Sequence, residues 1–151
     1  MAWMEGTHEE TRTLPLPADV AAAHFANPER ILAATKGLES HEVEGHTIHF
    51  ILEEEDHGVV KFKADYRCTY TLDGTTVRWA PTGEGNLQQS GEATFTPNDD
   101  GGCTLHYQES LKIDLPVASM MAPMLKPLLG PLVAKEIAAY LDRIVGSLPT
   151  G

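Results

Sequence analysis

The sequence predicts an α+β fold in which a curved antiparallel sheet of six or seven strands closes around a C-terminal helix, with two short helices after the first strand. Long stretches in the middle of the chain alternate between apolar and polar residues, as strands with one face in water do. The last part of the chain repeats apolar residues at three- and four-residue spacing, as a helix does. Because a sheet must cover its apolar face, we expect this helix to pack against it.

The chain is expected to open with an edge strand over residues 6–14, followed by an alanine-rich helix over residues 19–25. Asn27 is suited to cap a second helix, because its side chain accepts hydrogen bonds from the free N–H groups of a first turn. Pro28 fits the first helical position. Gly37 is expected to end this helix.

Two hairpins are expected in the middle of the chain. Residues 41–44 and 46–53 form the first hairpin around Gly45, and the acids at 53–56 form a solvated turn. A long strand over residues 60–72 then turns back in a tight turn at Asp73-Gly74. The residues that share the apolar face of this long strand and its return strand are Val60, Phe62, Ala64, Tyr66, Cys68, Tyr70, Leu72, Val77 and Trp79.

The last predicted strand, residues 103–115, follows a turn at 97–102. Its alternation places Glu109 on the apolar face, beside Cys103, Leu105, Tyr107, Leu111, Ile113 and Leu115. A buried carboxylate costs free energy unless it is paired, protonated or solvated in a cavity. Glu109 is therefore a candidate for orienting a ligand or for general acid–base chemistry, and the alternative is a bulge that turns it outward.

The C-terminal helix is expected to start at Pro131 and to loosen at Gly146. The preceding stretch, residues 115–134, carries one charge and is long enough to suggest a membrane span. Its four prolines argue against a span. Met121 and Met124 lie in this stretch, which is interpreted as a lid, a transient membrane or protein contact, a homodimer patch or ordinary packing.

Composition fits a single domain over residues 1–151 and argues against several functions. A net charge of -11 repels phosphate backbones, so nucleic acid is not expected as a partner. Cys68 and Cys103 have no metal-binding or redox spacing, and no signal peptide is expected, which favours a reducing, cytoplasmic location. His46 and His49 would face opposite sides of a strand, so no metal is expected, and no cofactor motif is present.

The order of elements resembles the helix-grip fold of the START-like superfamily, also called SRPBCC, which includes polyketide cyclases and lipid-transfer proteins. The segment Leu16–Thr35, with its Asn-Pro between two short helices, is similar to the opening of that superfamily. The sequences Asn-Pro-Glu-Arg-Ile-Leu (27–32), Gly-Leu-Glu (37–39), Gly-Glu-Ala-Thr-Phe (91–95) and Cys-Thr-Leu-His-Tyr (103–107) are similar to its carbon monoxide dehydrogenase G branch. The four prolines before and within the C-terminal helix depart from the pattern.

This resemblance implies a cavity between sheet and C-terminal helix that holds a lipid, quinone or polyketide-like molecule. The expected ligand-binding residues are Phe62, Tyr66, Tyr70, Trp79, Tyr107, Glu109, Met121, Met124 and Leu125. Three functions fit: a carrier of a small hydrophobic molecule, a cyclase/aromatase-type enzyme using Glu109 in proton transfer, or a protein-interaction module. A second polar residue of the cavity within hydrogen-bond reach of Glu109 would favour the enzyme, and an acid alone among apolar walls would favour ligand anchoring.

Overall fold

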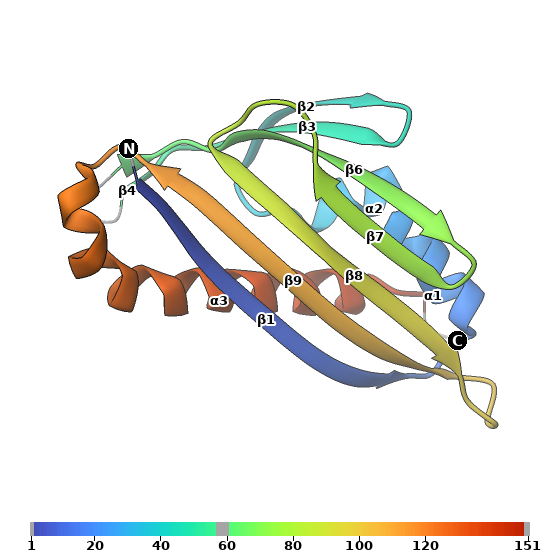
Figure 1. Cartoon of the computed structure of the whole chain (residues 1–151). Coiled ribbons are helices and arrows are strands. Elements are labelled where there is room, and N and C mark those ends of the chain that lie inside the picture. Colours follow the sequence, from blue (N-terminus) through green and yellow to red (C-terminus); the bar gives the residue numbers. More distant parts are fainter. Residues whose placement is uncertain (1, 57–60, 150–151) are drawn as a thin grey trace.

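The computed structural model describes residues 2–56 and 61–149 and contains a seven-stranded antiparallel sheet in the order β1-β9-β8-β7-β6-β3-β2. The strands are β1 (Ala2–Leu14), β2 (Leu38–Glu44), β3 (Thr47–Leu52), β6 (Asp65–Asp73), β7 (Thr76–Pro81), β8 (Leu87–Pro97) and β9 (Cys103–Leu115). Figure 1 shows helix α3 (Ala122–Gly146) lying across one face of the sheet. With α1 (Ala18–Ala26) and α2 (Pro28–Ala34) after the first strand, the predicted fold class is confirmed.

Helix α3 lies against the β1 and β9 side of the sheet and contacts α2. Gly6 of β1 permits this close approach, because a Cβ at Gly6 would lie 2.6 Å from the side chain of Val133. The buried stripe of the helix consists of Leu125, Leu129, Val133, Ile137, Leu141 and Ile144. Since the helix rests on one side of the sheet, the inner faces of β6 and β8 have space above them.

The prolines do not delay the start of the C-terminal helix, so the predicted start at Pro131 is wrong. The helix begins at Ala122, and both Pro127 and Pro131 lie inside it. A proline in a helix leaves the carbonyl four residues earlier without its N–H partner. Pro123, Pro127 and Pro131 recur every four residues and are all exposed, so they share the outer side of the helix, where water can solvate the freed carbonyls.

The predicted long strand 60–72 is interrupted. Its start, Val60, lies outside the described residues. The next two residues form β5 (Lys61–Phe62), which pairs with β4 (Glu55–Asp56), so half of the predicted solvated turn at 53–56 is a strand. The main sheet resumes at β6, where the Asn86 side chain accepts from the Asp65 N–H and donates to the Lys63 carbonyl. The Asn86 side chain thus satisfies the hydrogen bonds of the backbone groups where the strand is interrupted.

Both predicted turns at the ends of β2 and β6 are confirmed, with Gly45 and Gly74 at positive φ. Asn27 caps α2 as predicted, its side chain accepting from the Glu29 N–H at 2.9 Å. The predicted end of α2 at Gly37 is wrong, because the helix ends at Ala34. Gly37 instead adopts a φ of 72° in the turn that leads to β2.

Candidate functional site

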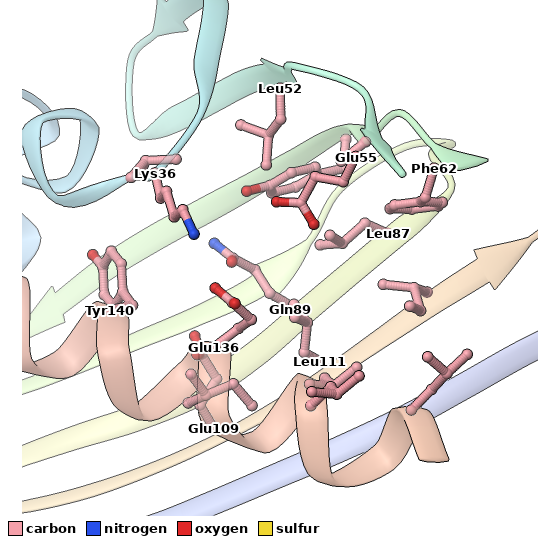
Figure 2. A pocket seen from close by; sticks show the side chains of 18 of the residues that line it. Lys36, Leu52, Glu55, Phe62, Leu87, Gln89, Glu109, Leu111, Glu136 and Tyr140 are labelled. Atoms are coloured by element: carbon pink, nitrogen blue, oxygen red, sulfur yellow. The ribbon is translucent and has the colours of Figure 1, made fainter. Parts of the chain in front are cut away.

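A cavity of about 390 Å³ lies between α3 and the inner face of the sheet. Its walls come from β6, β8, β9 and α3, with contributions from β3, β5 and the turn after α2. Half of the lining residues are apolar: Leu52, Phe62, Ala64, Leu87, Leu111, Ile113, Leu115, Leu129, Leu132, Val133 and Ile137. Figure 2 shows polar side chains gathered opposite part of this apolar wall.

Glu109 is the buried acid of the site. It points inward from β9, as the alternation predicted, and is 5% exposed. The Trp79 indole N–H donates to its Oε1 at 2.8 Å. The two residues come from β7 and β9, with β8 between them.

Gly91 explains how the Trp79 indole reaches across that intervening strand. In the register of the sheet, Gly91 lies beside Trp79 on one side and Glu109 on the other. A Cβ at Gly91 would lie 2.7 Å from the indole Cζ2. The bare backbone of β8 therefore lets the indole pass over it to the carboxyl group.

Burial raises the pKa of Glu109 to about 8, against an ordinary value of 4.5. The hydrogen bond from Trp79 opposes this rise, because it stabilises the charged form. The Tyr107 hydroxyl is buried close to the same carboxyl and also favours its charged form, although it makes no hydrogen bond of good geometry among the described residues. At neutral pH most of the Glu109 side chains are therefore protonated, and a neutral carboxyl group is a hydrogen-bond donor.

Three more tyrosines line the cavity: Tyr66 and Tyr70 from β6, and Tyr140 from α3. Burial raises the pKa of each of these hydroxyls, which keeps them protonated. Tyr70 accepts a hydrogen bond from the Gln89 amide at 2.7 Å. The Tyr66 ring stacks on Phe50 with centroids 4.8 Å apart.

The mouth of the cavity is marked by its exposed lining residues, which are Lys36, Glu53, Glu55, Leu132 and Glu136. In Figure 2 the Lys36 amine points toward the polar end of the cavity, near Gln89 and Tyr140. Arg143 also lines this region, but its Nε donates to the Ala34 carbonyl at 2.6 Å. That bond ties the end of α3 to α2.

The structure brings together four of the residues predicted to bind a ligand, namely Phe62, Tyr66, Tyr70 and Glu109. Trp79 and Tyr107 lie behind this lining, with ring centroids 5.5 Å apart. Met121, which directly precedes α3, and Met124 on the helix are instead 40% and 71% exposed, and Leu125 is buried in the core. None of these last five belongs to the cavity lining.

Sequence reasoning missed Tyr140, Glu136 and Lys36 as lining residues. Tyr140 belongs to the apolar stripe predicted for the helix, and its hydroxyl on that stripe was the available signal. No such signal marks Glu136 or Lys36, because each is an ordinary charged residue in its local sequence. Gln89 of β8 also lines the cavity.

Neither a metal site nor a membrane-spanning helix is found in the described residues. Within 2–56 and 61–149, no group of His, Cys, Asp or Glu side chains converges in a way that could hold a metal ion. Nor does any helix in this part of the chain combine the length and apolar character needed to cross a bilayer.

Several solved structures have a fold similar to that of this chain. No protein-family model and no curated protein matches the sequence. A conserved protein of Geobacillus kaustophilus matches with a TM-score of 0.69 at 18% identity, over 96% of this chain and 95% of that chain. The Zhui aromatase/cyclase of Streptomyces sp. R1128 matches with a TM-score of 0.64 at 15% identity, over 95% and 93% of the two chains.

The norcoclaurine synthase of Thalictrum flavum matches with a TM-score of 0.60 at 13% identity, over 96% of this chain and 94% of that chain. At these identities the likeness concerns the fold. It confirms the predicted fold, an antiparallel sheet closed over a C-terminal helix with two short helices after the first strand. The finer similarity to the carbon monoxide dehydrogenase G branch stays a prediction from the sequence.

Proposed function

We propose that the protein binds and carries a small hydrophobic molecule of lipid, quinone or polyketide-like type between its sheet and α3. The cavity of about 390 Å³ carries this proposal. Small-molecule sites commonly measure about 300–1,000 Å³, with largely apolar walls and a few polar groups that fix orientation. This cavity has such walls and one buried acid, Glu109. A cytoplasmic location fits Cys68 and Cys103, which are free thiols.

The surroundings of Glu109 support a carrier more than an enzyme. Its hydrogen-bond partner is the Trp79 indole N–H, which does not ionise at ordinary pH. The nearby Tyr107 hydroxyl stays protonated as well, because burial raises its pKa. Proton-transfer catalysis commonly needs a second group that takes up or releases protons within reach of the first. An acid held by an indole can donate a hydrogen bond and so anchor a ligand.

A cyclase/aromatase-type enzyme is a second candidate, favoured by one observation. The pKa of Glu109, raised to about 8 by burial, lies near the pH at which a general acid or base works best. The enzyme hypothesis predicts that a short poly-ketone substrate is turned over, and that Glu109→Gln abolishes turnover while leaving binding intact. Binding without turnover by the unaltered protein would leave the carrier as the function.

The direct test of the carrier proposal is native mass spectrometry of the protein purified from cells, followed by solvent extraction. We expect a retained apolar molecule whose mass identifies its class. A neutral solvatochromic dye provides an independent assay. Ala64→Leu should weaken dye binding because Ala64 is buried in the cavity wall, whereas Ala80→Leu, at an exposed site on β7, should not. Equal dye binding by both variants, with no extracted molecule, would contradict the proposal.

We further propose that the ligand is exchanged at a lipid surface contacted by the outer side of α3. Met121, Met124, Leu128 and Leu132 form an exposed stripe there, and Leu132 also lines the cavity. The stretch 115–134 contains no acidic residue, although the whole chain carries 22. This part of the surface therefore lacks the charge that repels the protein from membranes elsewhere.

Phosphatidylcholine vesicles test this contact. The double variant Met124→Glu and Leu128→Glu should lose vesicle binding while retaining dye binding in the cavity. Leu72→Glu, at a site 46% exposed at the far end of β6, is the matched control and should behave like the unaltered protein. Absence of vesicle binding by the unaltered protein, or a dimer in solution that the double variant dissociates, would refute the lipid contact.

A further inference from the structure

The two ends of the cavity differ in chemistry. In Figure 2, Gln89, Glu109 and Tyr140 lie at one end, whereas Phe62 and Leu87 lie at the other. The buried polar groups thus gather at one end of the cavity, whereas the carboxylate near Phe62 and Leu87 belongs to Glu55, which is exposed at the mouth. A molecule that satisfies both ends has one polar end and an apolar body.

The polar end offers mostly hydrogen-bond donors. One oxygen of Glu109 accepts from Trp79, so the proton of the neutral acid is available for a ligand. The hydroxyls of Tyr66 and Tyr140 have no hydrogen-bond partner among the described residues, and both side chains line the cavity. Gln89 contributes the opposite kind of group, because its amide N–H donates to Tyr70 and leaves its carbonyl oxygen as an acceptor.

We propose that the molecule held in this cavity is uncharged and presents a carbonyl oxygen to Glu109 and the neighbouring tyrosine hydroxyls, with its apolar part toward Phe62 and Leu87. This inference rests on the proposed binding function and specifies the ligand class. A carbonyl oxygen has two lone pairs and can accept from two of these donors at once.

A positively charged ligand fits this end less well. An amine would require Glu109 to be ionised, and burial opposes ionisation. The buried titratable groups around Glu109 are neutral hydroxyls and a thiol: Tyr66, Cys68 and Tyr70 from β6, Tyr107 from β9 and Tyr140 from α3. Glu136 of α3 also lines this part of the cavity, but it is exposed to water at the mouth. From β1, His8 lies opposite Glu109 in the register, and its ring is hydrogen-bonded to Glu10 at 2.7 Å.

A carboxylate ligand also fits less well. Among the described residues that line the cavity, the cationic group without a bonded partner is Lys36; its amine points toward the polar end, but the side chain is exposed to water, which screens its charge. A ligand carboxylate placed beside Glu109 would lose its hydration next to a carboxyl group that is itself buried. A neutral carbonyl group loses less hydration free energy than a carboxylate when it is transferred from water into the cavity.

Four naphthalene derivatives of the same size separate these possibilities: 2-acetylnaphthalene, 2-naphthoic acid, 2-(aminomethyl)naphthalene and 2-ethylnaphthalene. We expect the ketone to bind the whole protein about tenfold more tightly than the hydrocarbon, the value of one good hydrogen bond. Tighter binding of the amine or of the acid than of the ketone would overturn the inference. Failure of all four, the hydrocarbon included, would instead overturn the proposed binding function.

Variants of Glu109 provide the second measurement. Glu109→Ala should reduce ketone affinity to that of the hydrocarbon, and Glu109→Gln, which keeps a donor, should largely restore it. Ketone binding by the unaltered protein should weaken above pH 8, as Glu109 loses its proton, and should become independent of pH in Glu109→Gln. Gln108→Ala, on the exposed face of β9, is the control. Equal ketone affinity in all variants and at all pH values would contradict the assigned contact.

Discussion

Replacement of Glu109 by glutamine should change how the stability of the protein depends on pH. The new side chain would keep an oxygen to accept from the Trp79 indole and would occupy nearly the same volume, but it cannot ionise. In the unaltered protein, burial raises the pKa of Glu109 from 4.5 to about 8 in the folded state. Between these two pH values the folded protein retains a proton that the unfolded chain has lost.

The sign follows from this difference in bound protons. Where the folded state binds more protons than the unfolded state, the free energy of unfolding falls as pH rises. The slope for one proton is about 1.4 kcal/mol per pH unit. Glu109 should therefore remove roughly 4 kcal/mol of stability between pH 5 and pH 8, and nothing further above about pH 8. Glu109→Gln removes this dependence.

Urea unfolding followed by circular dichroism at pH 5, 6, 7, 8 and 9, at constant ionic strength, measures the effect. The free energy of unfolding of Glu109→Gln, minus that of the unaltered protein, should rise steadily to pH 8 and then level. Glu136→Gln, at the exposed mouth, controls for the loss of one negative charge and should run parallel to the unaltered protein. A constant difference between Glu109→Gln and the unaltered protein would refute the buried, protonated acid.

Two further predictions concern Trp79 and the glycine beside it. In a Trp3→Phe background, Trp79 is the remaining tryptophan, and its fluorescence should titrate with a midpoint near pH 8 that disappears when Glu109 is also changed to Gln; a flat titration would show that the indole does not sense this carboxyl. Gly91→Ala should cost about 1–3 kcal/mol and shift the Trp79 emission, because the added methyl group overlaps the indole. Ser90→Ala, at an exposed neighbouring site, should change the free energy of unfolding by no more than about 0.5 kcal/mol. Equal stability of the two variants would disprove the close contact between the Trp79 indole and the backbone at Gly91.

Patterns of neighbouring residues predicted much of the fold. The alternation along β9 placed Glu109 on the inner face, and the Asn27 cap with Pro28 located the start of α2. Both features depend on residues within a few positions of each other. The same reasoning failed at Pro131, which lies inside α3. A helix tolerates a proline on its solvent-exposed side, and the local sequence does not show which side of the helix is exposed.

The sequence by itself determined the class of fold, the inward position of Glu109 and the inward side chains of β6, since periodicity fixes which face of a strand a residue occupies. Tertiary structure alone decided which side chains meet. Trp79 reaches Glu109 because β8 lies between their strands and presents Gly91 at the crossing point. The cavity is open because Gly6 lets α3 rest against β1, leaving space over β6 and β8. These contacts join residues far apart in the chain, and their geometry depends on strand order and helix position, which no local pattern encodes.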